Sequence, residues 1–256
     1  KFLRAPDIFF TILEKGKGKL VRLGDIADVK FGIKTGADSF FYLTREQALS
    51  LKIEKEYLTP LLVSSDQAKT FETATSDTDI FLVSTDKPKS KIVGTNLYAY
   101  IVRGEKEKFH GRGGASIPAE RPTCKGHRPF WYSVSIPVAP SIYWMEMRRE
   151  RYFTLFNQGR LVADHTFYGV YPYDGVHGYT LCALLNSTLI PLFVEVFAND
   201  PGGGGTTLQT PTGETKRHVY LPLSLVGSKE LTDSFRELSK RASKSILDEC
   251  GFSRDE

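Results

Sequence analysis

The sequence has 256 residues, of which 41% are hydrophobic and 25% charged, an ordinary globular composition with enough apolar residues for a core. No stretch approaches the ~20 apolar residues of a membrane-spanning helix, so the composition predicts no contact with a membrane. The net charge of +4 is mild. The position of the positive charges therefore matters more for function than their total.

The three cysteines, Cys124, Cys182 and Cys250, lie far apart and show no C-x-x-C spacing. They form no zinc site by themselves and predict reduced thiols in a cytoplasmic protein. The sequence starts at Lys1 without an initiator methionine and soon enters a helical pattern. This start indicates a fragment of a longer protein.

The N-terminal elements follow from local patterns. Residues Pro6–Lys15 predict a short helix, with proline and aspartate in its first turn and Gly16 at its end. Residues Leu20–Lys30 predict two strand-like ends around a helical turn. Residues Phe31–Gly36 predict a loop punctuated by glycine.

The following elements are predicted by aromatic content and capping. Residues Ser39–Leu43 predict a strand because aromatic residues favour strands. Thr44 and Gln47 have the spacing of a capping box and predict the start of a short helix. Residues Asp79–Ser84 predict a buried strand, and residues Thr95–Val102 predict a helix.

The second half begins with short aromatic segments that predict strands separated by turns: Phe130–Val134, Ser141–Met145, Tyr152–Phe156 and Phe167–Tyr171. Residues Tyr179–Ser187 begin the clearest apolar helix, which we expect to bend near Pro191 and to end before the glycine run Pro201–Gly205. Residues Val219–Leu223 predict a brief extended piece.

Ser228 has the chemistry of an N-cap and predicts a final helix from about Lys229 to Glu249. Strands and helices alternate without a βαβ rhythm. We therefore expect an α+β fold with a mixed, mostly antiparallel sheet core, short helices and a C-terminal helix. Residues 1–226 are expected to form one domain, with residues 227–256 forming a helix that packs on it or extends from it.

Positive charge gathers between Lys106 and Phe130, where six lysines and arginines face two glutamates, a net +4 that equals the excess of the whole chain. A second basic cluster follows at Arg148, Arg149 and Arg151. Local positive charge beside aromatic residues is what a surface that follows phosphates needs. A solvated basic loop is the alternative, and charge alone does not decide between them.

Several catalytic patterns can be weighed. Asp7, Asp28 and Lys30 match the loose P-D…(D/E)-x-K pattern of Mg²⁺-dependent nucleases, but Asp7 is expected in the first turn of a helix, the wrong setting. The pair Asp164-His165 is expected to be a hydrogen-bonded pair and not an acid–base couple. The run Gly202–Gly205 lacks the flanking residues of a phosphate-binding loop. It fits either a close approach to a phosphate backbone or a flexible connection.

Ordered segments resemble one known family. Residues Leu3–Phe10 and Leu23–Leu43 resemble the opening of the target-recognition domain in Type II N6-adenine methyltransferases and single-chain restriction–modification enzymes. Residues Leu23–Ala27 are also similar to the specificity subunits of Type I systems. Later segments fit the same pattern: Arg128–Tyr132, Asp164–Tyr168, Leu184–Ser187 and the glycine-rich stretch before Leu221–Leu223. The polar stretch Thr206–Lys216 departs from it.

The resemblance implies a domain that docks on double-stranded DNA and reads a short sequence, largely in the major groove. The Asn/Asp-Pro-Pro-Tyr/Phe tetrapeptide that holds a flipped adenine is not in the sequence. We therefore expect no catalytic residue, metal or cofactor here. S-adenosylmethionine and methyl transfer are expected in a missing methyltransferase domain of the same polypeptide, with or without a nuclease.

The residues expected to contact DNA lie in the loop after residue 29 and in the basic stretch: Lys30, Lys34, Thr35, Asp38, Arg112, Arg121, Lys125 and Arg128. The aromatic residues Trp131, Tyr132 and Trp144 are expected to pack in the core. Two other readings stay open. One is a stand-alone Mg²⁺-dependent nuclease, and the other is a protein-interaction domain without a nucleic-acid role.

Overall fold

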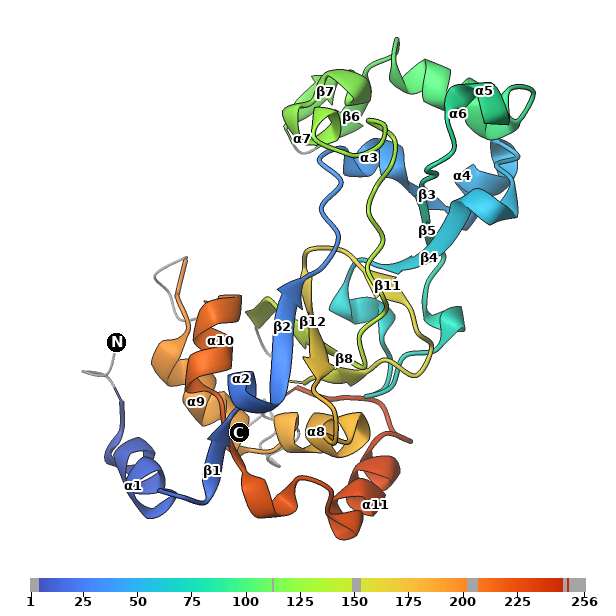
Figure 1. Cartoon of the computed structure of the whole chain (residues 1–256). Helices are drawn as coiled ribbons and strands as arrows, with labels where there is room; N and C mark the ends of the chain where they lie inside the picture. The colour runs from blue at the N-terminus through green and yellow to red at the C-terminus, as the bar shows by residue number, and fades with distance from the viewer. Residues whose placement is uncertain (1–4, 112, 149–152, 202–206, 246–247, 249–256) are drawn as a thin grey trace.

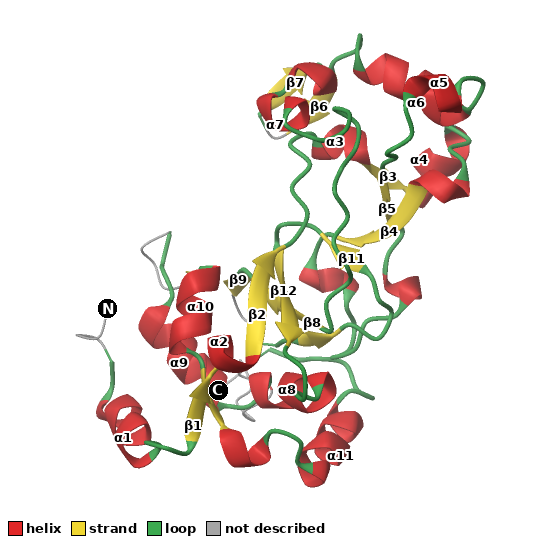
Figure 2. Ribbon diagram, viewed as in Figure 1, coloured by secondary structure: helices red, strands yellow, loops and turns green. Residues whose placement is uncertain are grey.

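The computed structural model describes residues 5–111, 113–148, 153–201, 207–245 and 248. Their buried side chains form two hydrophobic cores, each the centre of one lobe. Figure 1 shows the large lobe, which holds both ends of the chain, below the small lobe. The fold mixes helices with mostly antiparallel sheets, as the α+β prediction expected (Figure 2).

The large lobe is built from elements at both ends of the sequence. It comprises α1 (Asp7–Lys15), β1 (Leu20–Arg22), α2 (Leu23–Ile26), β2 (Ala27–Phe31), β8 (Ile142–Met145), β9 (Met147–Arg148), β10 (Leu155–Phe156), β12 (Phe167–Pro172), α8 (Gly178–Leu185), α9 (Leu189–Phe197), β13 (Leu208–Gln209), α10 (Thr212–His218), β14 (Tyr220–Pro222) and α11 (Lys229–Leu238). Its main sheet has the strand order β10-β8-β12-β2, with every pair antiparallel, so β2 is an edge strand.

The small lobe is built mainly from the first half of the sequence. It comprises α3 (Asp38–Phe41), β3 (Tyr42–Thr44), α4 (Arg45–Ser50), β4 (Leu58–Leu62), β5 (Ile80–Val83), α5 (Lys89–Ile92), α6 (Asn96–Gly104), the hairpin of β6 (Phe109–Gly111) and β7 (Gly114–Ser116), and α7 (Pro122–Lys125). The short strand β11 (Val162–Ala163) returns from the second half and pairs with β4 in parallel.

The pairing of β4 with β11 joins the two lobes. Side chains of consecutive strand residues point to opposite faces of a sheet. Leu61 and Val162 accordingly lie in the small core, whereas Leu62 and Ala163 lie in the large core. One two-stranded seam therefore contributes to both cores and fixes the lobes to each other.

Several predicted elements are confirmed. Helix α1 follows Pro6 and ends at Gly16, and the unit β1–α2–β2 has the predicted strand–turn–strand pattern. Thr44 and Gln47 form the predicted capping box of α4, with both hydrogen bonds present. The predicted strands at β5, β8 and β12 and the predicted helix at α6 are also present.

Two predicted aromatic strands are wrong. Residues Ser39–Leu43 are mostly helical, because α3 covers residues 38–41 and only its aromatic end passes into β3. Residues Phe130–Val134 form no strand. This segment makes side-chain hydrogen bonds in place of strand pairing. For example, the Ser133 hydroxyl donates to the carbonyl of Thr85 at 2.8 Å. The aromatic residues were placed by core packing and not by strand pairing. For the segment Tyr152–Phe156, the part described forms β10 at its end.

The final helix is shorter than predicted. Ser228 caps α11 through a hydrogen bond from the backbone amide of Leu231, but the helix ends at Leu238. The chain then turns toward another segment, because the Ser239 hydroxyl donates to Glu72 at 2.7 Å and the Ser243 amide donates to the carbonyl of Lys69 at 3.3 Å. These tertiary hydrogen bonds replace the next helical turn.

The apolar helix predicted from Tyr179 is broken before Pro191 into α8 and α9, which meet at 68°. Within the described residues no single helix is long and apolar enough to span a membrane, although this bent pair has the length and composition together. Its apolar side chains are largely buried in the large core. The polar stretch Thr206–Lys216 contains β13 and most of α10, and the glycine run at residues 202–205 lies outside the described residues.

Candidate nucleic-acid interface

The two segments predicted to face DNA lie together in the structure, although about 90 residues separate them in the sequence (Figure 1). The thiol of Cys124 in α7 donates to the backbone carbonyl of Thr35 at 3.4 Å. Burial raises the pKa of this thiol to about 11, so it stays protonated and able to donate. We call residues 30–38 and 106–128 together the candidate interface.

Gly36 permits this close approach. Its φ of +75° lies in the left-handed region, which other residues adopt at a cost. A Cβ atom at Gly36 would stand 2.3 Å from the Cβ atom of Thr123 in α7. Only glycine therefore lets the loop pack against α7 in this way.

The loop is also fixed to the large lobe. The amide of Gly32 donates to Phe167 at 3.0 Å, and the amide of Ile33 donates to Ala163 at 2.9 Å. A Cβ atom at Gly32 would stand 2.0 Å from the backbone oxygen of Asp164. The loop thus connects both lobes through tight backbone contacts, which give it a defined position.

Thr35 holds the shape of the loop. Its side chain is fully buried, its hydroxyl donates to Asp38 at 2.5 Å, and it accepts from the amide of Ala37 at 3.1 Å. Thr35 was predicted to contact DNA, but its buried side chain cannot reach a partner on the surface. Asp38 itself is exposed, in the first turn of α3.

Exposed cations lie along the candidate interface, from Lys34 near the lobe junction to the end of the small lobe formed by α7 and the β6–β7 hairpin. Lys34, Lys125 and Arg128 are exposed and Arg121 is half-buried. The guanidinium of Arg121 lies beside the hairpin, 3.8 Å from a Cβ atom placed at Gly111. The predicted residue Arg112 lies outside the described residues.

Local contacts leave these cations unneutralised. Arg128 donates through Nη1 to the carbonyls of Lys125 and His127, at 3.0 and 2.8 Å, and so caps the end of α7. In the described parts of the chain no carboxylate forms an ion pair with the four cations Lys34, Arg121, Lys125 and Arg128. The nearby Glu107 is paired with Arg103 at 2.9 Å. The candidate interface is therefore electropositive and open to an anionic partner.

The three aromatic residues predicted to pack in the core are largely buried. Trp144 and Tyr132 are buried, as predicted. Trp131 is partly buried against the small core, with its ring centroid 5.2 Å from that of Phe40. Its indole N–H donates to Glu105 at 3.1 Å, which fixes the ring in place.

In the second basic cluster, the one residue that the structure describes, Arg148, does not lie on the surface. Arg148 is only 1% exposed, and its guanidinium lies 4.0 Å from the centre of the Trp144 ring. It is a core residue that stacks on an aromatic ring. Arg149 and Arg151 lie outside the described residues. Arg148 is therefore too buried to contact a phosphate backbone, as the cluster was expected to do.

A basic site on the large lobe was missed by the sequence analysis. Lys216 of α10 forms an ion pair with Asp28 of β2 at 3.1 Å, and Lys30 lies 3.4 Å from the same carboxylate. The hydrogen bond from Lys216 holds the pKa of Asp28 below its ordinary value. The pair links residues 188 positions apart. Two local signals could have located α10: Pro211 at its start and basic residues in its last turn. They could not have predicted the contact between Lys216 and Asp28.

The pair Asp164-His165 has a structural role. Asp164 is buried and accepts hydrogen bonds from the amide and hydroxyl of Thr166, at 2.8 and 2.5 Å. His165 Nδ1 lies 3.6 Å from its other oxygen. Burial raises the pKa of Asp164 above its ordinary value. The carboxyl group stabilises a turn beside the loop at Gly32.

The carboxylates of the nuclease pattern form no metal site in the described residues. Asp7 lies in the first turn of α1, and the carboxylate of Asp28 is engaged by Lys216 and Lys30. Across the described ranges no group of three or more His, Cys, Asp or Glu side chains is placed to hold a metal ion.

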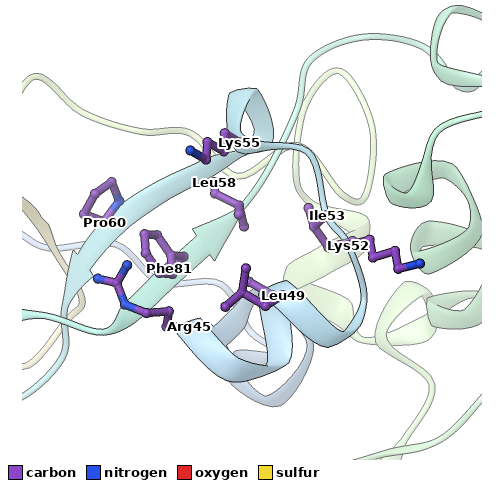
Figure 3. A pocket seen from close by; sticks show the side chains of 9 residues that line it. Arg45, Leu49, Lys52, Ile53, Lys55, Leu58, Pro60 and Phe81 are labelled. Carbon is purple, nitrogen blue, oxygen red and sulfur yellow. The ribbon is translucent and has the colours of Figure 1, made fainter.

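A separate hollow of about 560 Å³ opens on the small lobe between α4 and the strands β4 and β5 (Figure 3). Its floor is apolar and includes Leu58, Pro60 and Phe81. Arg45 lies at its edge, over the Phe81 ring and paired with Asp79 at 2.7 Å. Helix α4, which borders the hollow, lies across the small lobe from α7 (Figure 1).

Comparison with known proteins connects this fold to restriction–modification enzymes. Residues 8–250 match the family model described as the C-terminal domain of Type II methyltransferase M.Eco57I. The Type II methyltransferase M.AccI of Acinetobacter calcoaceticus is 31% identical over 125 residues, covering 45% of this chain and 22% of that protein.

One solved structure supports the fold of this chain. The type IIG restriction endonuclease BpuSI superposes over 93% of this chain with a TM-score of 0.62 and 12% identity. The type IIL restriction-modification enzyme MmeI in complex with DNA matches 68% of the chain with a TM-score of 0.48 and 17% identity. The chain spans 29% of the BpuSI chain and 22% of the MmeI chain.

Proposed function

The chain belongs to the family of the C-terminal domain of Type II methyltransferase M.Eco57I, and on this premise we propose that it binds duplex DNA and reads a short sequence. It would serve as the target-recognition part of a restriction–modification adenine-N6 methyltransferase. Methyl transfer, the S-adenosylmethionine site and any nuclease would belong to other parts of that enzyme. The parent protein would act in the cytoplasm.

The observation that carries this proposal is the junction of the two basic segments. Loop 30–38 and α7 meet through Thr35, Gly36, Thr123 and Cys124. The junction brings the segment that carries Lys34 against α7, the helix that carries or adjoins the other unneutralised cations. Rigid backbone elements that present basic side chains are what positioning on a phosphate backbone requires.

The side chains divide by their chemistry. Arg121, Lys125 and Arg128 are the candidates for guanine edges, because arginine and lysine pair with the guanine O6 and N7 atoms in the major groove. Asp38 is exposed beside them and could accept from the amino group of cytosine. Lys30 and Lys34, nearer the lobe junction, are the candidates for phosphates.

Selection from a pool of duplexes with a randomised centre tests this function. The chain is expected to enrich one short motif from the pool. At physiological salt it should bind that motif at least about 1,000-fold more tightly than a scrambled duplex, the lower range for specific recognition. The logarithm of the affinity should fall linearly with the logarithm of the salt concentration.

Equal affinity for the enriched and scrambled duplexes would refute sequence reading and leave only general electrostatic binding. Failure to bind any duplex at low salt would refute the DNA role altogether and favour a protein-interaction domain. Cleavage of the pool in the presence of Mg²⁺, abolished by Asp28→Ala, would show that the nuclease reading is correct.

A further inference from the structure

An exposed aromatic ring stands at the junction of the two lobes. Phe31 ends β2 and leads into the loop of the candidate interface. Its side chain is 50% exposed, although burial of a phenylalanine side chain contributes about 1.5–3 kcal/mol. Among the described residues, Phe10 and Tyr173 have comparably exposed aromatic rings, at 47% and 48%, but Phe31 is the one of the three that lies in the candidate interface.

The ring is held in a fixed orientation. It packs edge-to-face on Tyr168 of the adjacent strand, with centroids 4.9 Å apart and planes at 80°. Tyr168 is buried, and the strand register places it directly opposite Phe31. The next residue, Gly32, is locked against Asp164. Phe31 is therefore a rigid surface feature.

A lysine lies over the same ring. The ammonium group of Lys34 is 4.7 Å from the ring centroid, and Lys34 has no ion-pair partner within the described residues. An aromatic ring beside an unneutralised cation matches the two parts of a nucleotide. The ring offers a stacking surface for a base, and the ammonium group offers a partner for the adjoining phosphate.

We propose that Phe31 and Lys34 form a stacking platform for one unpaired nucleotide at the edge of the bound duplex. This inference rests on the proposed DNA-binding function. When the nucleotide binds, the Lys34 ammonium moves from the ring to the phosphate, and the base takes its place on the exposed ring. A fully paired duplex cannot use the ring in this way, because its bases are already stacked on each other.

Binding to matched duplexes with and without one unpaired nucleotide tests the platform. In the motif enriched from the randomised pool, a single base is left unpaired at each position in turn. At one position the chain should bind the unpaired duplex roughly 5- to 150-fold more tightly than the paired one, as expected for one base stacked on an aromatic side chain.

The Phe31→Leu variant should lose this preference, measured as the ratio of its affinities for the unpaired and the paired duplex. The Phe31→Trp variant should retain it, because an indole ring also stacks. Lys34→Gln should weaken the preference and lower the salt dependence of binding to the unpaired duplex by about one phosphate contact. Leu49→Ala, at an exposed apolar position beside the hollow on α4, serves as the control outside the candidate interface and should change neither quantity.

A preference that persists in Phe31→Leu would overturn the platform, and so would the absence of a preference at every position in the unaltered chain. These outcomes differ from failure of the proposed function, in which the unaltered chain binds no duplex at all. A thermal melt of Phe31→Leu accompanies the binding assay. If this variant unfolds, loss of the preference in a Phe31→Met variant that remains folded decides the question, because methionine also lacks a ring.

Discussion

Replacing Arg121, Lys125 and Arg128 together with alanine is expected to lower the affinity for the selected duplex by at least about 100-fold, because each paired contact to a base contributes about 1–3 kcal/mol. If these side chains bind phosphates instead, the salt dependence should become shallower, by about 0.9 in slope for each phosphate that is no longer neutralised. Fluorescence anisotropy of a labelled duplex at several salt concentrations measures both effects.

A variant with the same change in charge provides the control. Lys229, Arg236 and Lys240 lie on and after α11, at the far end of the large lobe from α7 (Figure 2). Their replacement by alanine removes three positive charges and should change the affinity less than about threefold, as expected for distant charges that salt screens. An equal loss of affinity in both triple variants would contradict the candidate interface. Circular dichroism checks that α7 survives the removal of Arg128.

The Gly36→Ala variant is expected to be less stable by about 2–5 kcal/mol, since left-handed backbone strain contributes about 1–2 kcal/mol and overpacking about 1–3 kcal/mol. The added methyl group would collide with Thr123 and separate loop 30–38 from α7. We therefore also expect a loss of DNA affinity under conditions where the variant is folded. Denaturant unfolding measures the stability, and anisotropy measures the affinity.

Gly94 is the matched control for this variant. It also has a positive φ, of +87°, but a Cβ atom there would have nothing within 4 Å. Gly94→Ala should carry only the backbone cost of about 1–2 kcal/mol and should leave DNA binding unchanged. If both variants were destabilised equally, the contact between Gly36 and Thr123 would not hold the loop on α7.

The elements that were predicted correctly are those with local causes. Helix α4 follows from the capping box of Thr44 and Gln47, and both of its hydrogen bonds lie within four residues. The alternation of β1, α2 and β2 follows from apolar residues around Gly24. Such signals depend on neighbours in the sequence, so a single sequence contains them.

The candidate interface could be predicted in part. The excess of charge between residues 106 and 128 and the resemblance of loop 30–38 both located segments that the structure then brings together. The side-chain roles within them could not be predicted. Thr35 looks like a polar surface residue in the sequence, yet its hydroxyl is buried and holds the turn.

Long-range contacts account for the other errors. Arg148 is buried because its guanidinium group stacks on the Trp144 ring. A charged residue in a sequence gives no sign that it stacks on an aromatic ring in the core. Lys216 contacts Asp28 across most of the chain. The final helix ends early because Ser239 and Ser243 bond to residues near position 70. Each outcome depends on tertiary structure that local patterns do not encode.

Photo-crosslinking to the selected duplex tests the central claim most directly, because it reports which residues lie against DNA. With photoreactive bases across the motif, followed by digestion and mass spectrometry, crosslinked peptides should come from residues 30–38 and 121–128. They should disappear when unlabelled motif is added in excess, but not when a scrambled duplex is added. Crosslinks confined to α11 or to the hollow beside α4 would contradict the candidate interface.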